Sequence, residues 1–148
     1  MTARAEELTV NPKLWNLIQE DPRYMYEAYE FVCETVTYTQ ERLGRAPAEH
    51  QREQSDTNHV CGQELLRGAC DLAVQQFGMM APVVFKLWGV HTTDDFGELV
   101  FNLIKIEQLS KSDRDDPNDF RDVFDLHAAL ADGFQLTTAA YPARKIDR

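Results

Sequence analysis

The chain has 148 residues, of which 43% are hydrophobic and 27% are charged, and its formal net charge at pH 7 is -10. This length suits one ordinary domain that buries roughly two thirds of its unfolded surface. The composition is that of a globular protein, not of a disordered, collagenous or membrane chain. The acidic balance disfavours nucleic acids and anionic membranes as partners, because both repel a negatively charged surface.

The cysteines and the N-terminal residues indicate a reducing compartment. Cys33, Cys61 and Cys70 are an odd number without a CxxC pair, a pattern that favours neither a disulfide framework nor a zinc site. The first residues include acidic side chains and no continuous apolar stretch, unlike a signal peptide. No window approaches the ~20 apolar residues of a membrane span. We therefore expect a cytoplasmic protein with no membrane association and no cofactor.

The first third of the chain predicts a helical pair over residues 11–43. Asn11 is a typical N-cap, and Pro12 suits the first helical position. A second, aromatic-rich helix is expected from about Met25, and Gly44 suits its C-terminal cap. Residues 45–58 contain no large apolar side chain, which predicts a flexible loop.

Three further helices are predicted by apolar side chains that recur at intervals of three and four residues. The first runs from Gly62 to Phe77 and the second from about Met80 to Trp88, and a glycine follows each of them. The third follows Thr92, a suitable N-cap, and extends to about residue 107.

The periodicity changes after this third helix. Leu109 and Ser110 precede a turn rich in Asp, Asn and Pro, and apolar residues then alternate from Phe120, which indicates a β-hairpin within residues 109–126. Helices followed by a hairpin give residues 62–126 the order of elements of a winged helix. Residues 127–148 are expected to form a short helix and a tail. The predicted fold class is one domain over residues 1–148, mainly α with a small C-terminal β-hairpin (α+β), in which residues 60–126 hold three helices and the hairpin.

Several short runs carry a resemblance to a known family. They are Arg23-Tyr24, Ala28-Tyr29-Glu30-Phe31-Val32, His59-Val60-Cys61-Gly62-Gln63-Glu64-Leu65-Leu66, Phe77-Gly78, Trp88-Gly89-Val90 and Asp95-Phe96-Gly97-Glu98-Leu99-Val100-Phe101-Asn102-Leu103-Ile104. Together they resemble the signature of an uncharacterised family of conserved hypothetical bacterial proteins, largely restricted to planctomycetes and verrucomicrobia. The resemblance covers most of residues 12–126. In the family, position 61 is usually Thr or Ser, which with Glu64 forms a capping box. The resemblance thus implies a helix cap at Cys61 and not a catalytic hydroxyl.

Motifs that carry chemistry are sparse. His59 and Cys61 offer two possible metal ligands, but the other histidines lie in dissimilar contexts without i, i+4 pairing, so we predict no metal site. Cys61 could act as a nucleophile with His59 as its base. The structural alternative is an ordinary loop histidine beside the start of a helix. No glycine-rich phosphate loop, G-x-S-x-G elbow or HExxH motif is present. We assign no catalytic residue, and an enzyme of a familiar class is disfavoured.

Two hypotheses about function from different classes remain. The first is a protein-interaction or regulatory binding module without catalysis, which binds a protein partner or a second copy of itself through aromatic residues such as Tyr24 and Tyr29, because exposed tyrosines are common binding anchors. The alternative is a winged-helix regulator that binds nucleic acid through the helix from Thr93. Asp94 and Asp95 at the start of that helix disfavour this alternative.

A weaker alternative is an enzyme of unfamiliar type. It would be built around His59, Gln63 and Glu64, and it requires a deep pocket that holds all three side chains.

Overall fold

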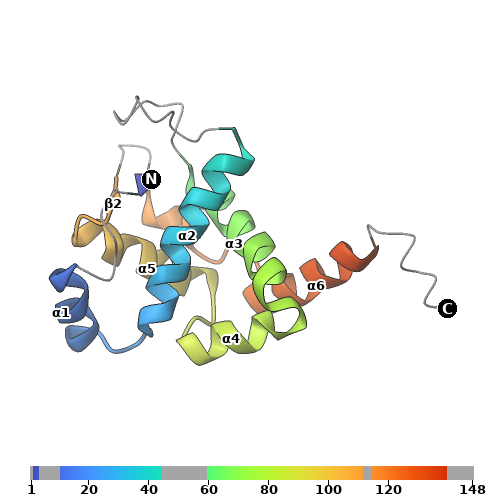
Figure 1. Ribbon diagram of the computed structural model, residues 1–148, viewed down its shortest axis with the longest axis horizontal. Coiled ribbons are helices and arrows are strands. Elements are labelled where there is room, and N and C mark those ends of the chain that lie inside the picture. The colour runs from blue at the N-terminus through green and yellow to red at the C-terminus, as the bar shows by residue number, and fades with distance from the viewer. Residues whose placement is uncertain (1, 4–10, 45–59, 112–114, 140–148) are drawn as a thin grey trace.

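The computed structural model describes residues 2–3, 11–44, 60–111 and 115–139, with the side chains of residues 11–44, 60–111 and 115–132. The α-helices of this part are α1 (Pro12–Glu20), α2 (Tyr26–Arg42), α3 (Gly62–Phe77), α4 (Ala81–Trp88), α5 (Thr93–Lys105) and α6 (Leu126–Ala139) (Figure 1). Two short 3-10 helices, η3 (Gly78–Met80) and η4 (Pro117–Phe120), and two short strands, β1 (Thr2–Ala3) and β2 (Leu109–Ser110), complete it. The prediction of a mainly helical protein is confirmed.

Local capping residues set the ends of most helices. Asn11 Oδ1 accepts the N–H of Lys13 at 3.0 Å, and Pro12 occupies the first turn of α1. At the start of α5, Thr92 and Asp95 form a reciprocal capping box. Gly89, which ends α4, has φ +90°, a conformation that L side chains rarely adopt. These signals lie within a few residues of the helix ends they control.

The core lies where α2 packs against α3 and α5, with α4 and α6 beside α3 (Figure 1). The helices α2 and α3 approach closely because Gly68 has no side chain. A Cβ atom at position 68 would lie 2.0 Å from Oγ1 of Thr39 on α2, which is far inside van der Waals contact. Leu65 and Leu66 on α3 and Leu99 on α5 are fully buried in this core.

The predicted C-terminal hairpin is wrong: the described parts of residues 109–126 do not pair with each other. β2 does form at Leu109–Ser110, but it pairs antiparallel with β1, where Ala3 is opposite Leu109. The segment predicted as the second strand of the hairpin instead contains the end of η4 and a turn. With the wing missing, the described residues do not support a winged helix in residues 62–126.

Side chains of α5 explain why this segment is no strand. The N–H of Asp122 donates to Oδ1 of Asp94 at 2.6 Å, and the N–H of Val123 donates to Oγ1 of Thr93 at 3.1 Å. A hairpin ladder would need such backbone donors. Phe120 is buried beside Gly97, where a Cβ atom would lie 2.6 Å from that of Phe120. The alternating apolar residues therefore reflect packing against α3 and α5.

The last described helix extends the predicted C-terminal one. Asp125 accepts the N–H of Ala128 at 3.1 Å, and Leu126 and Leu130 are buried in the core. The predicted flexible loop, residues 45–58, lies outside the described residues. No helix in the described part of the chain is long and apolar enough to cross a membrane.

Candidate functional site

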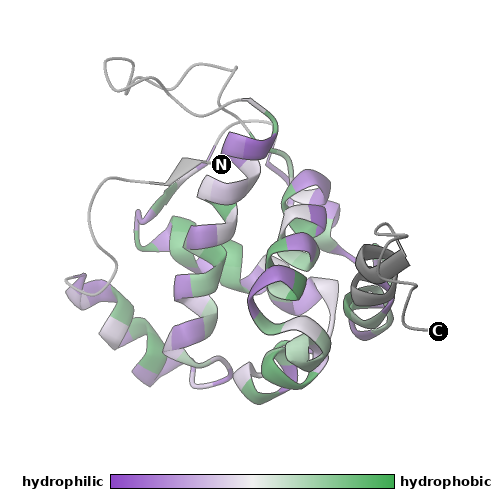
Figure 2. Cartoon of the chain, turned by 45° about the vertical axis from the view of Figure 1, so that its right-hand side comes forward, coloured by the Kyte–Doolittle hydropathy of each residue, from purple (hydrophilic) through white to green (hydrophobic). Residues whose placement is uncertain are grey.

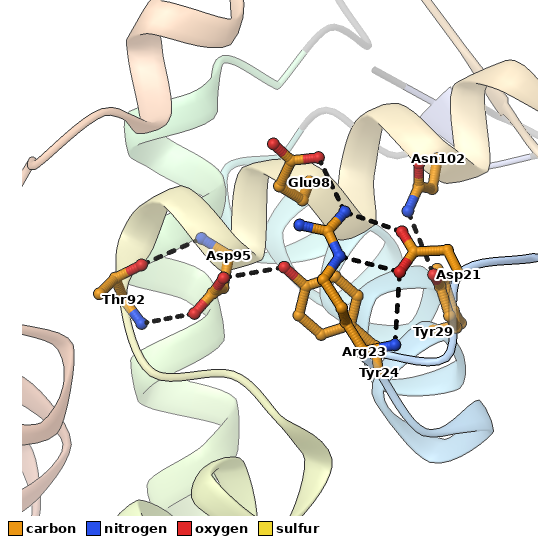
Figure 3. Close-up of polar contacts among 8 residues, drawn as sticks. All are labelled: Asp21, Arg23, Tyr24, Tyr29, Thr92, Asp95, Glu98 and Asn102. Carbon is orange, nitrogen blue, oxygen red and sulfur yellow. Dashed lines mark hydrogen bonds and ion pairs between the residues drawn. The ribbon is translucent and has the colours of Figure 1, made fainter. Parts of the chain in front are cut away.

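The structure buries both tyrosines that the sequence suggests as binding anchors. Tyr24 is 2% exposed and Tyr29 is fully buried, and their rings pack edge to face with centroids 6.5 Å apart. Each phenol oxygen is bound by α5: Tyr24 donates to Oδ1 of Asp95 at 2.8 Å, and Tyr29 accepts from Nδ2 of Asn102 at 3.2 Å (Figure 3). Burial raises the pKa of Tyr24, and the hydrogen bond to Asp95 raises it further. Both phenols therefore join the start of α2 to α5 and present no surface to a partner.

The same junction holds a cluster of charged side chains. Arg23 donates two hydrogen bonds to the carboxylate of Asp21, at 2.8 and 2.7 Å, and one to Glu98 at 3.4 Å (Figure 3). The hydrogen bond from Arg23 lowers the pKa of the Asp21 carboxyl to about 2. Asp21 is therefore ionised at neutral pH and unsuited to act as a general acid there.

The Asp95 carboxylate is also fully engaged. Besides the Tyr24 hydroxyl, it accepts the N–H groups of His91 at 2.9 Å and Thr92 at 3.2 Å. These contacts satisfy backbone donors at the start of α5, which otherwise lack intrahelical partners. The carboxylate has a structural role, and no oxygen remains unengaged for general acid–base chemistry.

The three polar residues of the enzyme hypothesis do not gather around a cavity. His59 lies outside the described residues, and Gln63 is exposed at the start of α3. Glu64 accepts the N–H of Cys61 at 3.1 Å, and Cys61 is the N-cap of α3. Burial raises the pKa of the Cys61 thiol, which is the opposite of what an activated nucleophile requires.

Two cavities among the described residues lie elsewhere. One of about 320 Å³ is bounded by α5 and η4 and is lined by Asp94, Glu98, Phe101 and Arg121, among others. The other, of about 430 Å³, lies beside His91 and the turn before α6. Asp94 and Glu98 are already bonded to Asp122 and Arg23, and no group of His, Cys, Asp and Glu in the described part of the chain could hold a metal ion. Both carboxylates that line the smaller cavity are therefore already engaged.

A surface of exposed apolar side chains lies on and beside α4. It consists of side chains on and beside α4 that are 45% to 71% exposed, and we call it the α4 surface: Met25, Met79, Met80, Val83 and Leu87. The opposite side of α4 carries Ala81 and Phe85, which are buried. The backbone of Met25 is fixed beside this helix, because its N–H donates to the carbonyl oxygen of Trp88 at 3.2 Å. In Figure 2, α4 at the base of the molecule is mostly coloured as hydrophobic.

The sequence contains a signal for this surface that helical periodicity alone does not reveal. Residues 79–88 are apolar at nearly every position, with Lys86 as the single charge. A helix that is apolar all round is usually buried on all sides. Here one side is exposed, which distinguishes α4 from an ordinary core helix.

Comparison with known proteins assigns no function to this surface. The family resemblance drawn from the motifs stays a prediction. No protein-family model, no curated protein and no solved structure matches this chain.

Proposed function

We propose that this protein is a protein-binding module, and that the α4 surface binds an amphipathic helix of a partner protein. The observation that carries the proposal is the exposure of five large apolar side chains on one short helix and its flanks. Exposed apolar residues that occur singly are ordinary, but a contiguous patch marks a binding surface. This proposal keeps the binding-module hypothesis and moves its anchors from the buried tyrosines to α4.

The arrangement of the α4 surface suits a helical partner. Met80, Val83 and Leu87 are spaced i, i+3 and i+7, which places them in one stripe along the exposed side of α4. A helix with a matching apolar stripe can lie along it, as in helix-in-groove recognition. Met79 precedes the stripe and the backbone of Met25 lies at the other end of α4, and the flexible thioethers of methionine adapt to partners of different shape.

The affinity expected from this contact is moderate. Leu87 is 70% exposed, and complete burial of a leucine side chain stabilises a complex by about 1.5–3 kcal/mol before entropic costs. A single such residue therefore contributes roughly 10-fold to 100-fold to an affinity. The contact resembles those of transient regulatory complexes more than those of obligate dimers.

The test uses a designed amphipathic peptide helix with leucines at i, i+3, i+4 and i+7 and an otherwise uncharged polar face. The peptide is titrated into isotopically labelled protein, and chemical-shift changes are followed by NMR. We expect the changes to cluster on α4 and at Met25, and the substitution Leu87→Gln to weaken binding at least 10-fold, following from the buried area above.

A matched control is available at the C-terminal end of α2, the end opposite Met25. Leu43 is also exposed, at 42%, but lies outside the α4 surface, so Leu43→Gln should leave the affinity unchanged. Absence of binding at millimolar peptide, or equal losses for both variants, would refute the proposal.

A further inference from the structure

The helix α2, which packs beside α4, carries a row of exposed carboxylates. Glu27, Glu30 and Glu34 recur at intervals of three and four residues and are all exposed on one side of α2, and we call them the acidic row. In the described part of the chain, none of the three forms an ion pair with a Lys or Arg side chain. Elsewhere in that part, Asp21, Asp71, Glu98 and Glu107 do have such partners.

Packing contacts through the buried side of α4 place the part of α2 that carries the acidic row along this helix. Phe31, next to Glu30 in sequence, contacts Phe85 and Trp88 of α4, with ring centroids 5.4 Å apart in both pairs. Glu34 accepts a hydrogen bond from Nε2 of Gln76 at 2.7 Å, three residues before the start of the apolar run at Met79. Glu27 follows two residues after Met25, the other end of the α4 surface.

The α4 surface and the acidic row together therefore have an apolar side and a negatively charged side. One side is apolar with Lys86 as its single charge, and the neighbouring side carries several carboxylates. An amphipathic helix that lies on α4 would place the flank of its own polar face against α2. Positive side chains on that flank would meet the acidic row, whereas acidic ones would be repelled.

We infer that the partner helix is basic: its apolar stripe packs on the α4 surface, and Lys or Arg side chains on one flank pair with the acidic row. This inference rests on the proposed function and names the chemical class of the partner. A second copy of this chain fits less well, because an isologous contact through α4 would bring two acidic rows to the rim of the same interface.

The experiment compares three peptides with one apolar stripe and with Lys, Gln or Glu at the flanking positions. We expect the Lys peptide to bind roughly 3-fold to 30-fold more tightly than the Gln peptide at low salt, the range for a few exposed ion pairs, and the Glu peptide to bind most weakly. Added salt should remove most of this preference, because exposed pairs are screened.

Two double variants separate the local row from the overall charge. Glu27→Gln/Glu34→Gln should abolish the preference for the Lys peptide, whereas Glu20→Gln/Glu107→Gln removes the same charge from exposed positions outside the row and should preserve it. Equal binding of the three peptides by the wild-type protein, or equal effects of both variants, would overturn the inference while leaving apolar docking on α4 intact. Failure of every peptide to bind would instead refute the proposed function. Sedimentation of the free protein as a dimer that Leu87→Gln dissociates would assign the surface to a second copy and overturn the inference.

Discussion

Asp95 concentrates several structural roles in one side chain. Its two oxygens accept hydrogen bonds from the Tyr24 hydroxyl and from two backbone N–H groups that precede α5, and its own N–H donates to Thr92. Tyr24 is nearly fully buried, so its hydroxyl depends on this one acceptor. Loss of the carboxylate would leave a buried donor unsatisfied as well as removing a helix cap.

We therefore expect the effects of substitutions at Tyr24 and Asp95 to be coupled. Tyr24→Phe should lower the free energy of unfolding by about 1–2 kcal/mol, the contribution of one hydrogen bond to a charged acceptor. Asp95→Ala should cost about 3 kcal/mol, because it removes the cap and strands the hydroxyl. The double variant should be no less stable than Asp95→Ala alone. Urea unfolding of the four proteins gives these values, and strictly additive losses would show that the hydrogen bond does not couple the residues.

At the scale of elements, the packing of α2 on α3 depends on one glycine. Gly68 faces Thr39 across the crossing, and the space for a methyl group is already occupied by the threonine Oγ1 atom. In an exposed helix, replacing glycine by alanine would stabilise the helix by about 1 kcal/mol. Here the steric clash opposes that gain, so the sign of the effect reports on the packing.

The substitution Gly68→Ala should lower the free energy of unfolding by about 1–3 kcal/mol, because the added methyl group forces the two helices apart. Thr39→Ala removes the Oγ1 atom that the methyl group would strike, and the double variant Gly68→Ala/Thr39→Ala should recover part of the loss. Thermal unfolding followed by circular dichroism measures the series. A stabilising Gly68→Ala substitution would contradict the close crossing.

Element boundaries are also where the sequence is most and least informative. The starts of α1 and α5 and the ends of α3 and α4 could be predicted, because Asn11, Thr92, Gly78 and Gly89 act on backbone groups of their own helices. The conformation around Phe120 could not, because it depends on Gly97 and on α5 side chains more than twenty residues away. A period of two predicts a strand here, but tertiary contacts override this local pattern.

The candidate site divides in the same way. The apolar run at residues 79–88 is visible in the sequence, but its periodicity does not reveal which side of α4 the rest of the chain covers. That Leu87 is exposed while Phe85 is buried follows from the packing of α2, α3 and α6 around the helix. Conversely, the aromatic residues at the start of α2 suggest a binding surface in the sequence, but Tyr24 and Tyr29 are buried against α5 in the structure.

At the scale of the whole molecule, the charge of -10 makes the response to acid informative. The pKa of Asp21 is held at about 2 in the folded protein, against an ordinary value of 3.8, chiefly by its hydrogen bonds with Arg23. Because the folded-state pKa is the lower one, the stabilisation is fully present above pH 4 and is lost as the pH falls from about 4 to 2. Arg23 is more than half exposed, so solvent screening reduces the contribution to about 1 kcal/mol or less.

The substitution Asp21→Asn should therefore lower the free energy of unfolding by up to about 1 kcal/mol at pH 7, and the difference from wild type should shrink as the pH falls from 4 to 2. Urea unfolding at a series of pH values between 2 and 7 follows the difference. A deficit that stays constant over this range would show that the carboxylate contributes through its shape and not through its charge.

The hydrogen bonds between the start of α2 and α5 join residues that are synthesised several seconds apart. Tyr24 and Asp95 are 71 positions apart, and Tyr29 and Asn102 are 73 apart. At ribosomal rates of roughly 5–20 residues per second, about 4–15 seconds separate the translation of each pair. During that interval the growing chain carries an aromatic helix whose hydrogen-bonding partners do not yet exist. A nascent chain stalled before residue 95 should expose that helix to chaperones and proteases, and the full-length chain should protect it.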